Sequence, residues 1–409
     1  RAARCDLRGN TIRIGTLSRR QAGQGYDTIS TEYRKRGHLS LIKHPAGRPE
    51  GAGTFCRPQV RARSADRRSG RVLPTAGPGA FCRPQVQENF LELRKGRFQM
   101  SYEPLILPDG YHSRLNIMDT EVAIKLAKDT FERELAAALH LTRVSAPLFV
   151  RPETGLNDDL NGVERPVQFD VRDLHADVQI VHSLAKWKRM ALGRYGFSAG
   201  TGLYTDMNAI RRDEELDNLH SVYVDQWDWE KVITREERNM ETLQDTVRRI
   251  MQALRRTQAV LTERFPALDP YLPDDITFLT SQELEDEYPD LLPKDREHAA
   301  ARKYGAVFIS QIGGKLRSGK PHDGRAPDYD DWSLNGDILI WYPVLGRSME
   351  ISSMGIRVDE KTLLAQLEEA DCMNRLSLPF HQMLLNGELP LTIGGGIGQS
   401  RLCMVLLEK

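Results

Sequence analysis

Strand-like runs in this chain come in groups between helical segments, rather than alternating one by one with helices. These apolar runs lie at residues 178–181, 221–224, 306–309, 338–341 and 349–351. One-by-one alternation is typical of a parallel sheet wound by crossover helices, whereas grouped strands tend to pair antiparallel. The sequence therefore predicts an α+β fold in which an antiparallel sheet is flanked by helices.

The segment after Thr120 predicts a helix followed by an edge strand. Asp119 or Thr120 is suited to cap the start of the helix. Its apolar residues recur at helical spacing, at Ile124, Phe131, Leu135 and Leu139. Residues 144–150 have the composition of a strand, and Pro147, which has no amide hydrogen, places that strand at a sheet edge.

A second long amphipathic helix is predicted further along the chain. Its apolar positions are spaced by three or four residues, at Leu243, Val247, Ile250, Met251, Leu254 and Leu261. Because an apolar stripe on one helix face packs against a core, we expect this helix to serve as scaffold.

The start of the chain differs in composition from the rest. Residues 1–100 hold 21 of the 57 basic side chains but only 7 of the 57 acidic ones, and the hexapeptide FCRPQV occurs at 55–60 and again at 81–86. A segment so rich in Arg, Gly, Pro and Ser buries too little apolar surface to offset its ordering entropy. We expect residues 1–99 to be a disordered basic leader, either translated upstream sequence or a targeting leader. Nucleic-acid binding and a transit peptide are the alternatives.

The sequence predicts a cytoplasmic protein with no membrane partner. No stretch approaches the roughly 18–20 consecutive apolar residues of a membrane helix, and no apolar region follows the basic start as it does in a secretory signal. After residue 99 the cysteines are Cys372 and Cys403, which lack the C-x-x-C spacing of a zinc site. We expect both to be buried free thiols in a reducing compartment.

A first polar cluster joins Arg211, an acidic loop and the segment 220–230. Arg211 is predicted to lie on one strand and Gln226 and Asp228 on the next, where two-residue alternation directs both side chains to the same face. A cation and two polar groups in one groove suit a phosphate next to an amino acid. The alternative is a charged hairpin that faces solvent.

A second cluster is a run of glycines near the end of the chain, at 394–398, followed by Arg401 and an apolar helix. Glycines such as Gly396 and Gly398 let the backbone approach a flat ligand or a neighbouring strand closely, and Arg401 at the start of the helix is placed to reach a phosphate. The run lacks the Gly-Lys-Ser/Thr of a Walker loop.

A third cluster holds acids on two predicted adjacent strands, Asp337 and Glu350. Magnesium typically takes one or two carboxylates together with phosphate oxygens and water, so these two side chains are candidate ligands for Mg²⁺. In the alternative, structural interpretation the same carboxylates pair with Arg325 and Arg357.

In chain order, three features resemble the three signature motifs of class II aminoacyl-tRNA synthetases: Pro147 after a helix, Arg211 with its acidic loop, and the glycine run that ends in Arg401. A closer resemblance, from about residue 121 to the last residue, is to bacterial-type ammonia-dependent asparagine synthetases. Four segments carry it: HSLAKWKR at 182–189, LHSVYVDQWDWE at 219–230, APDYDDW at 326–332 and GGGIGQSR at 394–401. The resemblance implies a catalytic domain over 100–409. It also implies a reaction in which L-aspartate and ATP form β-aspartyl-AMP and pyrophosphate, after which ammonia displaces AMP to give L-asparagine.

The resemblance also implies roles for individual residues. Arg211, together with Glu350, Gly396, Gly398 and Arg401, would bind ATP, and Asp337 and Glu350 would hold Mg²⁺. Substrate binding is implied for Ser183, Lys188, Asp228, Asp330, Ser352, Ser353 and Arg357. Catalytic roles are implied for Asp158, Arg211 and Gln226, with Asp158 as the acid that binds ammonium and accepts its proton.

The family's scaffold implies a homodimer formed through about residues 120–150. Compared with the family, the loop after residue 333 is shorter and the chain ends soon after Arg401, so we expect a C-terminal truncation. An aspartyl- or asparaginyl-tRNA synthetase is the leading alternative. Such an enzyme carries an N-terminal OB-fold module, for which residues 1–119 have too few strand-like runs, so no tRNA partner is expected. A non-catalytic relative should have lost Arg211, Arg401, Asp337 or Glu350, and all four are present.

Overall fold

The computed structural model describes residues 6–7, 10–11, 105–158, 160 and 164–409. The chain divides into two compact units, Arg1–Asn89 and Phe90–Lys409. In the first unit two short strands, β1 (Asp6–Leu7) and β2 (Asn10–Thr11), pair antiparallel. The predicted disorder of residues 1–99 otherwise falls outside the described residues, and the predicted boundary after residue 99 stays a prediction.

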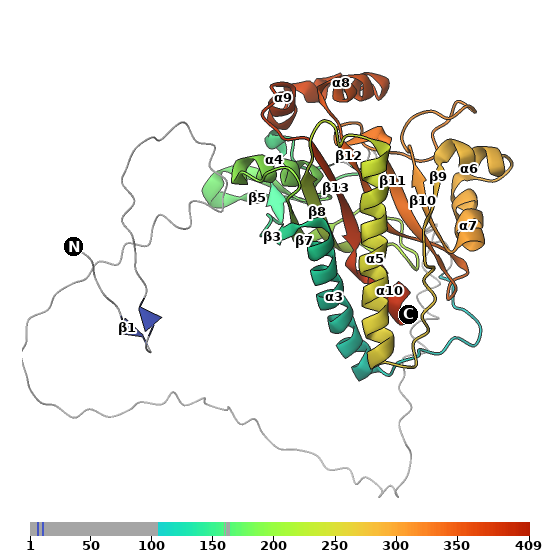
Figure 1. Ribbon diagram of the computed structural model, residues 1–409. Coiled ribbons are helices and arrows are strands. Elements are labelled where there is room, and N and C mark those ends of the chain that lie inside the picture. Colours follow the sequence, from blue (N-terminus) through green and yellow to red (C-terminus); the bar gives the residue numbers. More distant parts are fainter. Residues whose placement is uncertain (1–5, 8–9, 12–104, 159, 161–163) are drawn as a thin grey trace, which may run out of the picture. The chain divides into compact units, whose positions relative to one another are not determined.

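An eight-stranded sheet forms the centre of the second unit (Figure 1). Its five central pairings are antiparallel, and the outermost pairing at each edge is parallel. The strands, in spatial order, are β3 (Leu141–Arg143), β7 (Gly202–Ile210), β8 (Tyr223–Val232), β13 (Thr392–Gly398), β12 (Arg347–Arg357), β11 (Asp330–Tyr342), β10 (Ala306–Ser310) and β9 (Thr277–Thr280). The predicted α+β fold with an antiparallel sheet is confirmed.

Two long helices, α3 (Ile117–Leu139) and α5 (Met240–Arg264), lie side by side against one face of this sheet (Figure 1). The six apolar positions that predicted α5 are all buried, which confirms its scaffold role. The α3 helix begins earlier than predicted. Its cap is Asn116, whose side chain accepts the backbone N–H of Asp119 at 2.9 Å. The predicted caps, Asp119 and Thr120, are therefore wrong.

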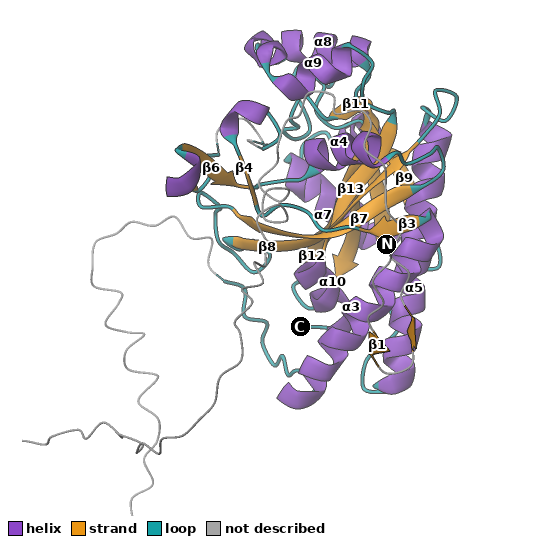
Figure 2. Ribbon diagram, turned by 90° about the vertical axis from the view of Figure 1, so that its left-hand side faces the viewer, coloured by secondary structure: helices purple, strands orange, loops and turns teal. Residues whose placement is uncertain are grey.

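The strand predicted over residues 144–150 is wrong in its boundaries. The edge strand is β3, which ends at Arg143, although the Val144 N–H still donates to Tyr204 at 2.9 Å. The chain then leaves the sheet across Pro147, and β4 (Phe149–Val150) joins β6 (Ala176–Ile180) and β5 (Gln168–Val171) in a separate three-stranded sheet. This small sheet lies away from α5 in Figure 2.

The other α-helices are shorter and pack around the large sheet (Figures 1 and 2). The α-helices are α4 (Ala185–Tyr195), α6 (Ser281–Glu287), α7 (Pro293–Tyr304), α8 (Glu360–Glu369), α9 (Pro379–Leu385) and α10 (Gln399–Leu407). Single 3₁₀ turns occur at Pro152–Thr154, Arg172–Leu174 and Met373–Ser377. The glycine run belongs to a strand, β13, which was not predicted, whereas Arg401 lies in the first turn of the helix that follows, as predicted.

Neither described cysteine forms a disulfide. Cys403 is buried as predicted, and burial raises the pKa of its thiol to about 11. Cys372 is only half-buried, so the prediction of two buried thiols is wrong for this residue. In the described part of the chain no helix has both the length and the hydropathy to cross a bilayer.

The packing of α5 generates a test of the core. Leu254 is 1% exposed whereas Val260, on the same helix, is 38% exposed. Leu254→Ala is expected to lower the free energy of unfolding by about 2–5 kcal/mol, since it leaves a cavity between α5 and the sheet. Val260→Ala should change it by less than about 0.5 kcal/mol. Urea unfolding of both variants measures the difference, and equal midpoints would contradict the scaffold role.

Candidate active site

A cavity of about 780 Å³ opens on the face of the large sheet opposite α3 and α5. This volume is within the range typical of small-molecule sites. Thirteen of the fifteen predicted site residues line it, from strands, loops and helices far apart in sequence: Ser183, Lys188, Arg211, Gln226, Asp228, Asp330, Asp337, Glu350, Ser353, Arg357, Gly396, Gly398 and Arg401. The fold therefore brings together clusters that lie up to 218 residues apart, from Ser183 to Arg401.

Strand β8 shows why the cavity has a polar wall. Trp227 and Trp229 are buried in the main core, where the Trp227 ring lies 5.1 Å from the Phe131 ring of α3. Two-residue alternation then turns Gln226 and Asp228 to the opposite face, where both line the cavity. The predicted shared face of Gln226 and Asp228 is confirmed, and the solvent-facing hairpin is excluded for them because Asp228 is buried.

The glycines of β13 leave room for these polar groups. A Cβ at Gly396 would lie 2.2 Å from Gln226 Oε1 and 2.6 Å from Asp228 Oδ1. A Cβ at Gly394 would lie 1.9 Å from Glu230 Oε2 and would displace it. Glycine leaves the room needed here because polar side chains from β8 cross directly over the backbone of the neighbouring strand.

A buried ion group lies at the base of the cavity. Arg357 donates to both oxygens of Glu230, through Nε at 2.9 Å and Nη2 at 2.7 Å, and also to Asp330. Lys188 donates to the Gly395 carbonyl at 3.0 Å and pairs with Asp228 at 3.3 Å. Each of these five charged side chains is nearly inaccessible to solvent. Three carboxylates and two cations leave one formal negative charge in this group.

The electrostatics of the ion group follow from burial and pairing together. Burial works against the charge on Arg357, but Glu230 and Asp330 raise its pKa above the ordinary value. Burial also raises the pKa of Glu230, but Arg357 and Lys188 outweigh it and bring that pKa below the ordinary value. For Lys188 burial dominates and lowers its pKa, although Asp228 opposes the change. Removing any one member would leave a buried charge uncompensated.

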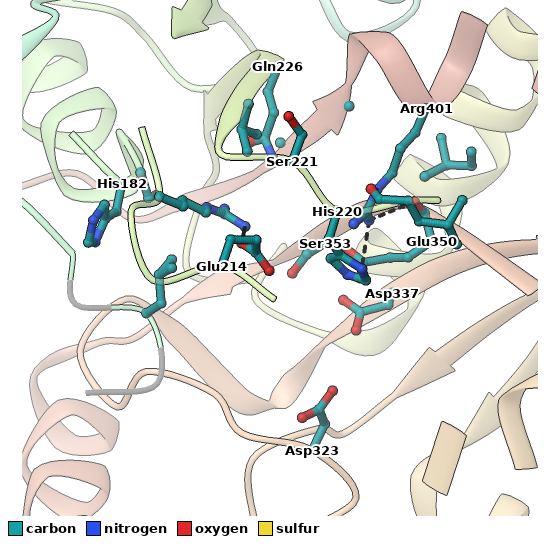
Figure 3. A pocket seen from close by; sticks show the side chains of 18 of the residues that line it. His182, Glu214, His220, Ser221, Gln226, Asp323, Asp337, Glu350, Ser353 and Arg401 are labelled. Atoms are coloured by element: carbon teal, nitrogen blue, oxygen red, sulfur yellow. Dashed lines mark hydrogen bonds and ion pairs between the residues drawn. The ribbon is translucent and has the colours of Figure 1, made fainter. Parts of the chain in front are cut away.

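A second group of charges, around Arg211 and Arg401, lies further along the cavity. Arg211 was predicted to lie on a strand, but it directly follows the last residue of β7. Its N–H donates at 2.8 Å to the carbonyl of Val222, the residue before β8. Its guanidinium lies 3.7 Å from Glu214. Arg401 donates to the Glu350 carbonyl at 3.1 Å and lies 3.7 Å from the Glu350 carboxylate. Figure 3 shows Arg401 beside Glu350, with His182 at the opposite end of the view.

Asp337 and Glu350 occupy adjacent strands, β11 and β12, as predicted, and both line the cavity. Burial raises the pKa of Asp337 to about 6, against the effect of Arg325. Burial also acts on Glu350, but Arg401 and Lys294 bring its pKa below the ordinary value. Within the described residues no three His, Cys, Asp or Glu side chains form a metal-binding group. Two carboxylates beside a space for phosphate oxygens fit Mg²⁺, which rarely uses an all-protein cage.

The alternative prediction was that Asp337 and Glu350 pair with Arg325 and Arg357. It is correct only for the pair of Asp337 and Arg325. Arg325 donates to Asp337 at 2.7 Å and also to Ser353. Arg357, however, pairs with Glu230 and Asp330 rather than with either predicted metal ligand. Asp337 is therefore paired directly with Arg325, while the Glu350 carboxylate lies 3.7 Å from Arg401 and is also influenced by Lys294.

Two predicted site residues do not line the cavity. Ser352 is 1% exposed and shares the core-facing side of β12 with Met354 and Ile356, because it alternates with Ser353, which lines the cavity. Asp158 is 3% exposed and lies behind the cavity wall, where its backbone carbonyl is 3.0 Å from His182 Nδ1. Its charge acts on Tyr329, a residue of the wall, whose pKa is raised first by burial and then by Asp158.

Several residues of the cavity were not predicted from the sequence. They are contributed mainly by α7 and by the loop before β11, and include Lys294, Glu297, His298, Asp323 and Tyr329. Polar residues at positions i, i+3 and i+4 of a short helix normally indicate a solvated face, so α7 carried no signal of a site. Only the tertiary structure shows that this face of α7 lines the cavity.

A buried carboxylate holds the segment that ends at Tyr329 and leads into Asp330, the first residue of β11. Asp328 is fully buried, and one of its oxygens lies 2.7 Å from Lys186 of α4, 2.9 Å from His381 of α9 and 3.1 Å from Arg375. Burial raises the pKa of Asp328, but Lys186, the hydrogen bond from His381 and the charge of Arg375 together hold it well below its usual range. Because Tyr329 and Asp330 follow directly, this cluster fixes one wall of the cavity.

Comparison with solved structures identifies the class of fold. An asparaginyl-tRNA synthetase from Pyrococcus horikoshii, complexed with asparaginyl-adenylate, superposes with a TM-score of 0.51 at 14% identity, covering 71% of this chain and 66% of that one. The Entamoeba histolytica asparaginyl-tRNA synthetase gives the same TM-score at 13% identity. At these identities the likeness shows the fold alone: the class II aminoacyl-tRNA synthetase fold that was predicted.

Sequence comparison is more specific. The profile described as aspartate-ammonia ligase matches residues 118–409. A protein named aspartate–ammonia ligase from Ruminiclostridium cellulolyticum is 64% identical over 306 residues, which cover 75% of this chain and 91% of the relative. One of the same name from Clostridium perfringens is 62% identical over 308 residues, covering 75% and 92%. The chain belongs to the aspartate–ammonia ligase family, as the resemblance predicted, and is a ligase.

The Asp328 cluster generates a test of pH dependence. Asp328→Asn is expected to lower the free energy of unfolding at pH 7 by about 3–5 kcal/mol, since Lys186 loses its buried counter-charge. The folded-state pKa of Asp328 lies below its ordinary value of 3.8, so its stabilisation is present above about pH 4 and is lost as the pH falls further. The difference between wild type and variant should therefore stay constant from about pH 8 to pH 5 and shrink below about pH 4.

Urea unfolding across this pH range measures the difference. Asp371→Asn, at an exposed position, serves as control and should leave the free energy of unfolding unchanged within about 0.5 kcal/mol. A wild-type-minus-variant difference that changes between pH 5 and pH 8 would assign the stabilisation to another titrating group.

Proposed function

We propose that this chain catalyses the ATP-dependent amidation of L-aspartate by ammonia, giving L-asparagine, AMP and pyrophosphate through a β-aspartyl-adenylate. One observation carries the proposal. A single cavity holds a buried, net-acidic ion group at one place and Arg211, Arg401, Asp337 and Glu350 at another, in a chain of the aspartate–ammonia ligase family. The reaction needs a site for the amino acid and a site for ATP side by side. A carboxylate is a poor electrophile, and ATP supplies the leaving group that activates it.

The ion group around Glu230 is suited to bind the amino acid. Its formal charge of minus one favours a ligand that adds a cation, and Asp228 and Gln226 offer oxygens to the ammonium group of L-aspartate. Lys188 and Arg357 are proposed to act on the carboxylates, and Ser183 and Ser353 to donate hydrogen bonds. For Ser352 the position away from the cavity supports only an indirect role in the packing of β12.

Arg211 and Arg401 are proposed to bind ATP, with Gly396 and Gly398 allowing close approach of the backbone. Arg211 would stabilise the charge that moves onto the α-phosphate as the aspartate side-chain carboxylate attacks, since a guanidinium fixed by its surroundings needs no reorganisation. Asp337 and Glu350 would hold Mg²⁺, which when bound neutralises the departing pyrophosphate. Arg325 would then be free of its pairing with Asp337.

Asp158 is proposed to serve the second half-reaction. A buried carboxylate attracts ammonium and accepts one proton from it, and the ammonia then attacks the β-carbonyl carbon while AMP leaves with the bonding electrons. Support comes from its burial and from its electrostatic effect on Tyr329, a residue of the cavity wall. Because Asp158 lies behind that wall, this role requires a path past Tyr329 to the adenylate.

An aspartyl- or asparaginyl-tRNA synthetase activity remains the second candidate. The observation in its favour is the shared fold, at 14% identity. The two candidates differ in the acceptor of the activated acyl group, which is ammonia in one case and RNA in the other.

We also propose that the enzyme acts in the cytoplasm.

We propose, in addition, that the protein is a homodimer that associates through α3 and β3. The start of α3 carries apolar side chains that stay accessible in one protomer, Ile117 at 81%, Met118 at 71% and Val122 at 49% exposure. A symmetric contact between two copies of this helix would cover all three.

The activity is tested by incubating the purified full chain with ATP, Mg²⁺ and L-aspartate, and adding either ammonium or bulk tRNA. We expect AMP and asparagine to form together and only with ammonium, as followed by chromatography. AMP release that depends on tRNA, without free asparagine, would favour the synthetase.

In the same assay Arg211→Ala is expected to lower kcat/KM by about 10²–10³-fold, because it removes a fixed donor to the transition state. Arg249→Ala is the matched control, since Arg249 is exposed on α5 and pairs with Asp245, and it should keep wild-type turnover. Equal rates for both variants would rule out the proposed role of Arg211.

The dimer is tested by light scattering after size exclusion. Met118→Glu should convert a dimer to monomers, because it places two charges in the contact. Leu364→Glu, at a position 40% exposed on α8, should leave the dimer intact. A monomeric wild type, or a dimer that tolerates Met118→Glu, would show that α3 is not the contact.

A further inference from the structure

Helix α7 forms one wall of the cavity. Its residues belong to none of the sequence motifs, and the proposed function assigns them no role. Lys294, Glu297 and His298 lie on one face of α7 at positions i, i+3 and i+4, and all three line the cavity. This face lies beside Asp337 and Glu350, since His298 contacts Ser348, two residues before Glu350 on β12. The helix therefore borders the phosphate end of the cavity rather than the amino-acid end.

The position of Lys294 is not explained by the stability of α7. Lys294 is the second residue of the helix, where the helix dipole disfavours a positive charge. Its side chain remains largely open to the cavity. The ammonium lies 3.2 Å from Glu297 and 3.2 Å from Asp323, which Figure 3 shows on the same side of the cavity as Asp337.

The charge on Lys294 is held by the carboxylates of the cavity. Partial desolvation lowers its pKa, but Glu297 and Asp323 outweigh this effect and raise the pKa above the ordinary value. The two predicted metal ligands, Glu350 and Asp337, add to the rise. The ammonium therefore stays protonated, on a flexible stem, next to the place where Mg²⁺ and phosphate oxygens are expected.

His298 supplies a neutral donor beside it. Its Nδ1 lies 3.2 Å from the Ser348 backbone N–H and 2.7 Å from the Ser348 hydroxyl. An N–H can only donate, so Nδ1 accepts and the ring proton is on Nε2. Burial, and then Arg347, lower the pKa of His298, which keeps the ring uncharged at neutral pH. The ring lines the cavity and offers Nε2–H to a ligand.

We propose that α7 forms the pyrophosphate subsite of this enzyme, in which Lys294 and His298 donate hydrogen bonds to the outer phosphates of ATP. The inference rests on the proposed function and deepens it. When the aspartate carboxylate attacks the α-phosphorus, the bond from that phosphorus to the bridging oxygen breaks and its electron pair goes to pyrophosphate. Lys294 leaves Glu297 and Asp323 to meet the new charge. A compact, flexible ammonium suits this exchange better than a fixed guanidinium does.

Pyrophosphate binding tests the proposal without relying on turnover. Titration calorimetry of the full-length protein with magnesium pyrophosphate, and separately with AMP, gives two dissociation constants for each variant. Lys294→Gln should weaken pyrophosphate binding by about tenfold or more, the effect of one charge-assisted hydrogen bond, and leave AMP binding within about twofold. His298→Phe should weaken pyrophosphate binding less, because it removes a neutral donor. Lys294→Arg should restore part of the affinity.

Lys303→Gln is the matched control. Lys303 lies on the same helix, is half-exposed and pairs with Glu287 away from the cavity, so its replacement should leave both dissociation constants unchanged. Wild-type pyrophosphate affinity in Lys294→Gln would overturn the proposal. Equal losses for pyrophosphate and AMP, with a lowered melting temperature, would overturn it in favour of a structural role.

The assay of asparagine formation by the wild type separates this inference from the proposed function. If the wild type binds magnesium pyrophosphate through Lys294 but makes no asparagine, the subsite stands and the proposed reaction fails. If asparagine forms while Lys294→Gln binds pyrophosphate normally, the reaction stands and the subsite fails.

Discussion

The ion pair between Arg357 and Glu230 is the interaction on which the rest of the site depends. It joins β12 to β8 across the glycine strand β13, and both side chains are buried to at least 97%. Such a pair is stable only if every partner is present, since desolvation of each charge is costly. Hydrogen bonds and charge are completed by Asp330, Lys188 and Thr392. The contacts tie the first residue of β11 and helix α4 to the centre of the sheet.

The two faces of the large sheet differ in chemistry because successive side chains of strands such as β8 point to opposite faces. Trp227 and Trp229 pack toward α3 and α5, while Gln226 and Asp228 face the cavity. Hydrophobic burial on the first face stabilises the strands, so the second face can hold charges that would destabilise an isolated sheet. The cavity therefore brings the ion group around Glu230 together with Arg211, Asp337, Glu350 and the polar side chains of α7.

The parts of the site carried by strands could be predicted from the sequence. Gln226, Asp228, Asp337 and Glu350 lie where two-residue alternation and adjacent strands were expected to put them, and Arg401 begins the predicted helix. The predictions failed where the position of a residue depends on tertiary contacts, which a local sequence pattern does not contain. Ser352 faces the core beside Met354, Asn116 capped α3 in place of Asp119, and the segment 144–150 leaves the large sheet and joins the small one as β4.

The sequence by itself determined the fold class, the family and the residue types available for chemistry, because periodicity and motifs are properties of neighbouring residues. Only the tertiary structure decided that Asp328 is held by Lys186, Arg375 and His381, and that Lys294 and His298 face the cavity. These contacts join elements that are distant in sequence. Their free energy depends on burial and on distances between charges, neither of which is encoded in a local pattern.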